Sequence, residues 1–463
     1  MRYRDSFEPI PLPNPTRSAT EPPVIRLQPI ATLIALLACC LTASSTFSSI
    51  RAEERIRISE KLPQTMPWDL ARLSQAPKFE WLDQNAPDQA SPAQTSTVRS
   101  LLFEGEPYAG KPTQVFAYYA DPQTVAGKGD GAPKGPWPAV VLVHGGGGTA
   151  FREWAELWAR RGYAAIAMDL AGSRPVEGAN AHAAENRTRL PQGGPGQGDE
   201  EKFGSIDKPP TEQWPYHAVA SVIKAHSLIR SFDHVDREKT AVTGISWGGY
   251  LTCIVSSIDS RFSAAVPVYG CGYLHENSVW LDRFQKMSEP QRQRWVTLWD
   301  PSNYLPASTV PTFFVNGTND FAYPLDSYMK SYSAVPGKKQ IRVTVNMPHG
   351  HPPGWAPAEI GLFIDEHCRG GVPLASVSTP ESSGDQITAT VKSDLPIVSA
   401  TLHHTSDEGP INQRKWADEP LTLDASRISG KAPPKSATAW FVTASDSRDA
   451  IVSSPVVIRD SAK

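Results

Sequence analysis

Short apolar runs alternate with helical periodicity along the middle of the chain. The runs at residues 138–143, 163–168 and 264–269 are continuously apolar, as strands buried on both faces require. Amphipathic periodicity predicts helices over residues 151–161 and 214–231. This alternation of strands and helices predicts an α/β domain with a mostly parallel sheet.

Further segments extend the same pattern. Predicted strands cover residues 115–119, 240–243, 310–316 and 340–346, and a closing helix covers residues 357–368. Residues 175–215 are polar and rich in Gly and Pro. A loop of this length in a compact domain usually has a function, so we expect a cap or a substrate rim there.

The pattern changes after Gly370 and Gly371. Short alternating segments with turn residues between them predict a β-sandwich-like domain over residues 372–463. The catalytic α/β domain is then expected over residues 97–371. Residues 53–96, which are rich in Pro, Gln and Ala, are expected to form a loosely structured lead-in.

The N-terminal region, residues 1–52, has the pattern of an export signal. An uncharged apolar run at residues 30–41 follows four arginines. The run is shorter than the ~20 residues that a membrane-spanning helix needs. We therefore expect export to the periplasm or the medium, cleavage after Ala52, and no integral membrane span in the mature chain. Cys39 ends a lipobox-like stretch, but lipid anchoring there ranks below simple cleavage.

Composition narrows the choice of partners and of covalent cross-links. The 45 basic and 48 acidic residues leave a net charge of −3, which provides no polycationic face for nucleic acid and favours a neutral or weakly charged substrate. Cys253, Cys271 and Cys368 remain after the signal region, and three cysteines imply no disulfide framework. Pairing of Cys253 with Cys271 stays open.

One serine lies in a turn of unusual composition. Gly244-Ile245-Ser246-Trp247-Gly248-Gly249 follows the predicted strand at residues 240–243 and precedes a helical segment. A strand-to-helix turn this tight needs glycine at the flanking positions and leaves the serine hydroxyl exposed. Ser246 is therefore the candidate nucleophile.

An acid and a base follow the serine in chain order. Asp320 and His349 each come just after a predicted parallel strand, at the sheet edge where α/β folds build their sites. A carboxylate that orients an imidazole, which in turn takes the serine proton, is what a serine nucleophile requires. His351 is the alternative base. We favour His349 because His351 runs into Pro352 and Pro353, which stiffen the chain.

Residues 138–373 resemble the α/β-hydrolase superfamily. The resemblance is closest to the acetyl xylan esterase and prolyl-oligopeptidase-like dienelactone hydrolase branches. The motifs that carry it are His144-Gly145-Gly146-Gly147, the Ser246 turn, Gly317-Thr318-Asn319-Asp320 followed by Pro324, and His349-Gly350.

This resemblance implies an α/β-hydrolase fold and a serine carboxylic-ester hydrolase that needs no cofactor. Ser246 would be the nucleophile, His349 the base and Asp320 its orienting group, with an acyl-serine intermediate. The oxyanion donors would be the backbone N–H of Trp247 and that of Gly145 or Gly146. An acetylated polysaccharide is the implied substrate. The expected aromatic substrate rim comprises Trp214, Trp280, Trp355 and Tyr323.

Three other functions fit parts of the sequence less well. A peptidase of the prolyl oligopeptidase type is the runner-up, but the chain before the hydrolase strands is too short for the propeller of that family. Gly145 to Ala150 with Asp169 outlines a dinucleotide fingerprint, yet any glycine run satisfies it. A non-catalytic binding module would not need an intact triad. No metal is expected, since His403-His404 and the acidic run at residues 199–201 fit solvated positions.

Overall fold

The computed structural model describes residues 56–82, 98–126, 134–176, 179–180, 183 and 185–459. The predicted signal region, residues 1–52, and Cys39 within it lie outside the described residues. The described residues from Ile56 onward belong to one compact unit.

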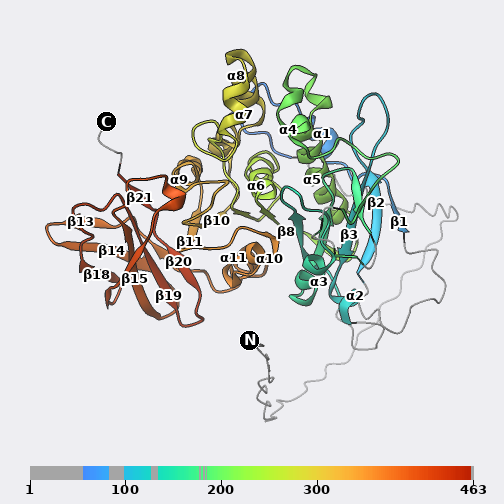
Figure 1. Ribbon diagram of the computed structural model, residues 1–463. Helices are drawn as coiled ribbons and strands as arrows, with labels where there is room; N and C mark the ends of the chain where they lie inside the picture. The colour runs from blue at the N-terminus through green and yellow to red at the C-terminus, as the bar shows by residue number, and fades with distance from the viewer. Residues whose placement is uncertain are drawn as a thin grey trace, which may run out of the picture. The chain divides into compact units, whose positions relative to one another are not determined.

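A parallel sheet forms the centre of this unit (Figure 1). Every parallel strand predicted from the apolar runs is present, as the α/β pattern requires. The parallel strands, in spatial order, are β5 (Ala164–Met168), β4 (Trp137–Val143), β8 (Val235–Ile245), β9 (Ala264–Val268), β10 (Thr312–Gly317) and β11 (Lys339–Thr344). At the β5 edge the sheet continues with the antiparallel strands β3 (Gln114–Ala120), β2 (Arg99–Glu104) and β1 (Phe79–Trp81).

Helices cover both faces of the parallel sheet, which is why its strands are apolar at almost every position. Helices α3 (Arg152–Arg160) and α11 (Ala358–Arg369) lie on one face, joined by an ion pair of 2.6 Å between Arg161 and Asp365. Helices α5 (Trp214–Arg230) and α6 (Trp247–Ile258) contact each other on the other face, and α9 (Leu325–Ala334) packs on β10.

The order in which the chain adds strands to the sheet reverses between β4 and β8. From β4 the chain passes through α3 to β5 on one side, and then through α5 to β8 on the other side. The turns after β4 and β8 therefore diverge at the carboxyl edge of the sheet, and α/β folds bind their ligands at such a point. Val143 and Gly244, at the ends of the two strands, are paired in register.

Some elements were not predicted from the sequence. The segment after Trp280 forms α7 (Leu281–Lys286) and α8 (Glu289–Trp299), and Ser288 caps α8 reciprocally with Gln291. His351 begins the short helix α10 (His351–Trp355), because the prolines that follow it are tolerated in a first helical turn. Other short elements are α1 (Leu70–Leu73), α2 (Pro122–Ala126), α4 (Asp199–Lys202), β6 (Ser173–Pro175) and β7 (Arg187–Arg189).

The C-terminal region is rich in antiparallel strands, as predicted, and one of its sheets joins the central sheet. Strand β20 pairs with β11 through Ile341 and Ser453, and the Val343 N–H donates to Ser453 Oγ at 2.8 Å. This sheet continues through β19 (Ala439–Asp446) and β15 (Ile397–Thr405) to β16 (Ala417–Pro420), with β20 at Ile451–Ser453 and β21 at Val457–Ile458. The other sheet contains β12 (Ser376–Val377), β13 (Glu381–Ser383), β14 (Gln386–Lys392), β17 (Thr422–Asp424) and β18 (Arg427–Lys431).

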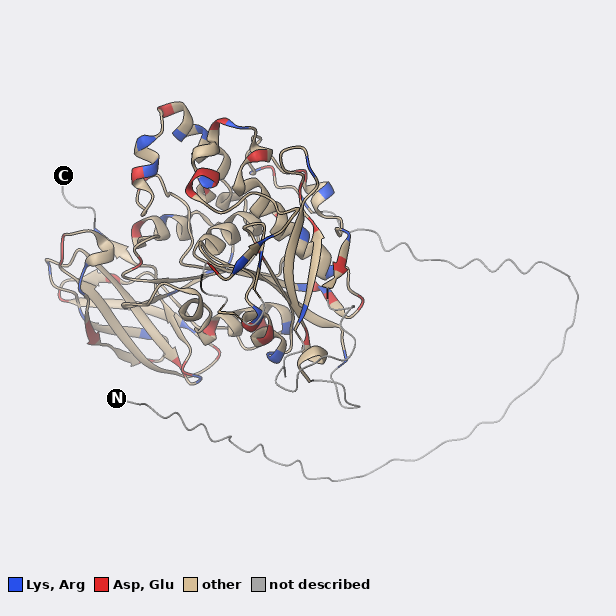
Figure 2. Cartoon of the chain, turned by 45° about the vertical axis from the view of Figure 1, so that its right-hand side comes forward, with Lys and Arg blue, Asp and Glu red and all other residues tan. Residues whose placement is uncertain are grey.

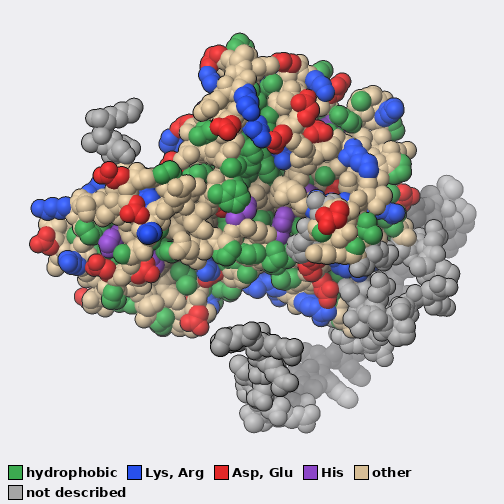
Figure 3. Space-filling view, in the orientation of Figure 1, with side chains coloured by type: hydrophobic (Ala, Val, Ile, Leu, Met, Phe, Trp, Pro, Cys, Tyr) green, Lys and Arg blue, Asp and Glu red, His purple; other side chains and the backbone are tan. Residues whose placement is uncertain are grey.

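The surface carries mixed charge. In Figure 2 acidic and basic residues are interspersed over the helices and strands in view. Figure 3 shows two histidine side chains near the middle of one face, bordered by hydrophobic side chains.

Among the described residues, no helix is long and apolar enough to cross a membrane. Within the same residues, no group of His, Cys, Asp and Glu side chains is arranged so that it could hold a metal ion. The three described cysteines are buried free thiols.

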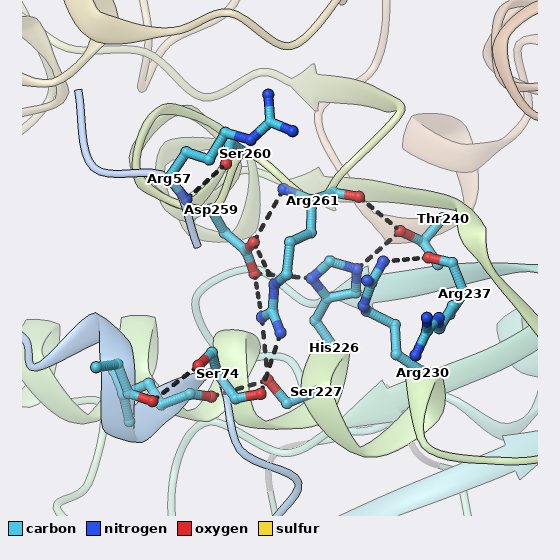
Figure 4. A network of polar contacts seen from close by, with 12 residues as sticks. Arg57, Ser74, His226, Ser227, Arg230, Arg237, Thr240, Asp259, Ser260 and Arg261 are labelled. Atoms are coloured by element: carbon cyan, nitrogen blue, oxygen red, sulfur yellow. Dashed lines mark hydrogen bonds and ion pairs between the residues drawn. The ribbon is translucent and has the colours of Figure 1, made fainter. Parts of the chain in front are cut away.

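A buried polar network ties the N-terminal lead-in to the base of the sheet (Figure 4). His226 of α5 donates to Asp259 at 2.8 Å, and its other nitrogen lies 2.8 Å from the Thr240 hydroxyl of β8. Burial lowers the pKa of His226 to about 3, so the ring is neutral at physiological pH. Arg261 contacts Asp259 at 2.7 Å and donates to the Ser74 carbonyl of the lead-in at 3.2 Å.

Substituting Asp259 by alanine is expected to destabilise the protein by about 3–5 kcal/mol, because Arg261 and His226 lose a buried partner. Urea unfolding monitored by tryptophan fluorescence measures the change. The control is Arg292→Ala, which removes an exposed ion pair with Glu289 and is expected to cost less than about 1 kcal/mol. Equal losses in the two variants would contradict the anchoring role of this network.

Candidate active site

Ser246 lies in a strained turn between β8 and α6. Its φ of 59° and ψ of −119° are unusual for a residue with a side chain, and its N–H donates to the Val268 carbonyl at 2.8 Å. The turn requires glycine at positions 244 and 248, because a side chain at either position would collide with backbone atoms. A Cβ on Gly244 would lie 2.2 Å from the Gly248 carbonyl oxygen, and one on Gly248 would lie 1.9 Å from that of Val143. Ser246 itself is half-buried.

Asp320 and His349 form a hydrogen-bonded pair on the loops after β10 and β11. His349 Nδ1 donates to Asp320 Oδ2 at 2.7 Å. The other carboxylate oxygen accepts the N–H groups of Ala322 at 3.0 Å and Tyr323 at 2.8 Å. The Asp320 side chain is fully buried, whereas that of His349 is 15% exposed. Three hydrogen bonds therefore fix the orientation of the Asp320 carboxylate. Because this carboxylate accepts from Nδ1 of His349, it keeps a proton on that nitrogen.

Tyr269, which follows β9, is a positioning residue that the sequence did not reveal. Its hydroxyl donates to the Pro348 carbonyl at 2.8 Å, and its ring stacks on that of His349 at a centroid distance of 4.6 Å. The ring of Phe321 lies 5.0 Å from His349. Tyr269 has a φ of 57°, so it turns the chain sharply at the end of its strand. In the sequence Tyr269 is the last residue of the apolar run at 264–269, so no local signal set it apart from the strand.

The parallel order of the sheet explains why these residues meet. Ser246, Tyr269, Asp320 and His349 follow β8, β9, β10 and β11, which are neighbours in the sheet. Residues that follow adjacent parallel strands emerge at one edge.

The glycine turn after β4 is held from below by His144. This buried ring donates from Nδ1 to the Gly145 carbonyl at 2.7 Å and accepts the Leu170 N–H on Nε2 at 2.9 Å. Burial lowers the pKa of His144, so the ring is neutral and fits both bonds. Within the described residues, the N–H groups of Gly146 and Trp247 have no hydrogen-bond partner. Trp247 opens the 12-residue helix α6, whose N-terminus favours negative charge.

His351 lies on this turn and not beside Asp320. Its Nε2 accepts the Gly145 N–H at 2.9 Å, and its ring packs on Phe151 at 4.6 Å. Of the two candidate glycine donors, Gly145 is therefore already engaged, while Gly146 is not.

The four candidate rim aromatics do not share one environment. Trp214 and Tyr323 are 0% exposed, so their rings belong to the packing beneath the site and present no surface to a substrate. Trp280 is partly buried and contacts the Trp247 ring at 4.6 Å. Trp355 is also partly buried and stacks on Trp154 at 5.2 Å. Large aromatic residues are often part of the core even where the sequence suggests a surface position. Of these four, Trp214 and Tyr323 are core residues, whereas Trp280 and Trp355 are partly exposed.

The fold and the arrangement at its carboxyl edge define the class of protein: the chain is an α/β-hydrolase. Residues 193–359, which include Ser246, Asp320 and His349, match the profile of the prolyl oligopeptidase family, and the chain is accordingly a serine hydrolase.

Solved structures of similar proteins include two acetyl xylan esterases. The enzyme from Paenibacillus sp. R4 is 22% identical, with 64% of this chain and 91% of that chain covered and a TM-score of 0.49. Acetyl xylan esterase 1 from Thermoanaerobacterium sp. JW/SL YS485 is 18% identical, with 63% and 89% covered and a TM-score of 0.47. The acylaminoacyl peptidase of Pyrococcus horikoshii is 17% identical, with 59% and 42% covered and a TM-score of 0.40.

Replacing Tyr269 by phenylalanine should lower kcat about tenfold with little change in KM, since the loop that carries His349 loses its anchor at Pro348. Steady-state kinetics on a small ester measures this effect. Tyr328→Phe is the matched control, because it removes a buried hydroxyl that donates to the Pro267 and Val315 carbonyls, away from His349. Equal losses of kcat in both variants would mean that Tyr269 acts only through stability.

Proposed function

We propose that the protein is an exported serine carboxylic-ester hydrolase that acts through Ser246, His349 and Asp320. The observation that carries the proposal is the 2.7 Å bond from His349 to the buried Asp320, on loops at the same edge of the parallel sheet as the Ser246 turn. Export is supported by the apolar run and arginines of residues 1–52. Residues 97–371 would form the catalytic domain.

The proposed reaction has two steps. The Ser246 hydroxyl attacks the ester carbonyl while His349 Nε2 takes its proton, and the developing oxyanion accepts the N–H groups of Trp247 and Gly146. His349 then gives that proton to the departing alcohol, which leaves an acyl group on Ser246. Water, deprotonated by His349, then attacks the acyl-serine. The carboxylic acid is released, and Ser246 regains its proton from His349.

Asp320 supports His349, and not His351, as the base. An imidazole can accept a proton from serine only if its acceptor nitrogen is available. His351 Nε2 already accepts the Gly145 N–H, and the Asp320 carboxylate holds His349 with Nδ1 protonated, which leaves Nε2 as the acceptor. We infer that His351 shapes the glycine turn instead.

The substrate class follows from the sequence resemblance to acetyl xylan esterases, so acetylated carbohydrate is the first candidate. Trp280 and Trp355, which are partly buried, remain candidates for contact with a sugar ring. The match of residues 193–359 to the prolyl oligopeptidase family makes a peptidase the second candidate. The two reactions share the acyl-serine step and differ in the leaving group.

Alanine substitutions distinguish the two histidines, and an assay panel distinguishes the reactions. Ser246→Ala and His349→Ala are each expected to lower kcat on the order of 10³-fold or more, whereas His351→Ala should cost far less. The panel comprises p-nitrophenyl acetate, longer-chain esters, acetyl-xylan with acetate release, and dipeptide amides. Faster turnover of amides than of esters would favour the peptidase. An inactive His351→Ala with an active His349→Ala would reverse the assignment of the base.

We further propose that residues 372–463 form a sandwich-like domain that braces the catalytic sheet. The contacts that support this proposal all involve β11 or its neighbours. Ser453 bonds Val343 of β11, and the buried Glu359 of α11 accepts the Ile451 N–H at 2.6 Å.

A chain that ends at Gly371 should therefore be less heat-stable and should hydrolyse small esters more slowly, because β11 leads directly into the His349 loop. Thermal unfolding and kcat on p-nitrophenyl acetate measure the two effects. Ser453→Ala in the full chain is the comparison, with an expected loss of about 1 kcal/mol in unfolding free energy. A truncated chain with unchanged stability and kcat would exclude a bracing role.

A further inference from the structure

A largely buried lysine lies near the glycine turn, and the proposed reaction gives its ammonium group no role. Lys202 ends α4 and is only 7% exposed. Its Nζ lies 4.9 Å from the centroid of the Trp247 ring and 5.7 Å from that of Trp214. Across the described part of the chain, this Nζ has neither a hydrogen bond nor an ion pair. Burial lowers the pKa of Lys202 to about 8, so most molecules carry the charge at neutral pH.

The acidic residues around Lys202 have other contacts. Asp199, at the start of α4, accepts hydrogen bonds from Arg283, which lies on α7. The Glu201 carboxylate lies against Gly198 of the preceding loop, and that of Glu200 lies against Gly204. None of them forms an ion pair with Lys202 among the described residues. The ammonium group of this largely buried side chain therefore has no carboxylate in direct contact, although the charges of Asp199 and Glu201 act on it from a distance.

Such a charge needs an explanation. Burial of an ammonium group without a partner is unfavourable, and aromatic faces recover only part of the lost hydration. A leucine or methionine at this position would fill the same space without that penalty. An anionic group that binds from outside would satisfy the ammonium.

A second cation approaches the same turn. Arg187 of β7 donates from its guanidinium to the Gly147 carbonyl, and its buried Nε has no partner in the described structure. Burial lowers the pKa of His144, and the positive charges of Arg187 and Lys202 lower it further. The two positive charges thus flank the turn that follows β4, next to the Ser246 turn.

We propose that Lys202, assisted by Arg187, binds an anionic oxygen group of the substrate, so that the preferred esters carry a carboxylate or a similar acidic group close to the ester. Trp247 links the two regions, because its N–H faces the proposed oxyanion and its ring lies beneath the Lys202 ammonium. This inference rests on the proposed ester hydrolysis, and it narrows the neutral or weakly charged substrate that the net charge favours to one with an acidic group.

The test compares pairs of esters in which one member carries an acidic group and the other does not. 4-Nitrophenyl hemisuccinate against 4-nitrophenyl butyrate places the carboxylate in the acyl part, and 3-acetoxybenzoate against phenyl acetate places it in the alcohol part. A 3-acetoxybenzenesulfonate arm distinguishes a carboxylate from a sulfonate. The readout is the ratio of kcat/KM for the anionic ester to that for its neutral partner. It is measured in the wild type, Lys202→Met, Lys202→Arg and the control Lys208→Met, whose lysine is exposed in the same segment.

The wild type should prefer the anionic ester in at least one pair. Lys202→Met should lower that ratio about tenfold or more, Lys202→Arg should retain part of the preference, and Lys208→Met should keep it. A ratio that is unchanged in Lys202→Met, or an equal fall on both esters, would overturn the proposal and leave Lys202 a packing residue. If Lys202→Met does not fold, Lys202→Gln replaces it under the same criteria.

A failure of the proposed function gives a different result. If the wild type hydrolyses none of the esters, the esterase assignment is wrong, and the anion site is then tested by calorimetry with succinate. Binding that is lost in Lys202→Met but kept in Lys208→Met would support the site. Binding that is absent from the wild type, or equal in all variants, would overturn it.

Discussion

The contact between Gly248 and the end of β4 is the constraint on which the site depends. A Cβ at this position would lie 1.9 Å from the Val143 carbonyl oxygen, so only glycine allows α6 to begin against the neighbouring strand. This close approach brings the Trp247 N–H and the glycine turn to one place. The strained backbone of Ser246 is held by the same packing, and an oxyanion site needs its donors positioned before the reaction begins.

Histidines in this protein differ in function because their surroundings differ. His144 and His226 are fully buried, and burial keeps both neutral. Each then uses one nitrogen as a donor and the other as an acceptor to join separate parts of the chain. Among the described residues, His349 makes a hydrogen bond through one ring nitrogen only, at the carboxyl edge of the sheet. The proposed base needs an acceptor nitrogen that no other group occupies, and partial solvent exposure together with one carboxylate partner provides it.

Much of the fold could be predicted from the sequence, because strands buried on both faces are continuously apolar and the helices between them are amphipathic. The Ser246 turn was readable for a related reason, since its glycines reflect backbone contacts. Tyr269 was not predicted, because nothing local distinguishes a positioning tyrosine from the last residue of a strand. The burial of Trp214 and Tyr323, and the engagement of Gly145 by His351, depend on residues far apart in the sequence. Periodicity carries no information on such contacts.

The junction of β20 with β11 also affects how the protein meets other molecules. A central sheet that ended at β11 would present a row of unpaired backbone groups to any other extended chain. In this protein the sheet instead continues to β16, a short outer strand that contains Asp418, Glu419 and Pro420. Acidic side chains repel a second copy and proline cannot donate to a ladder, so this edge resists strand-to-strand association. The C-terminal region thereby gives the enzyme a protected sheet edge, which favours its staying dispersed at high concentration.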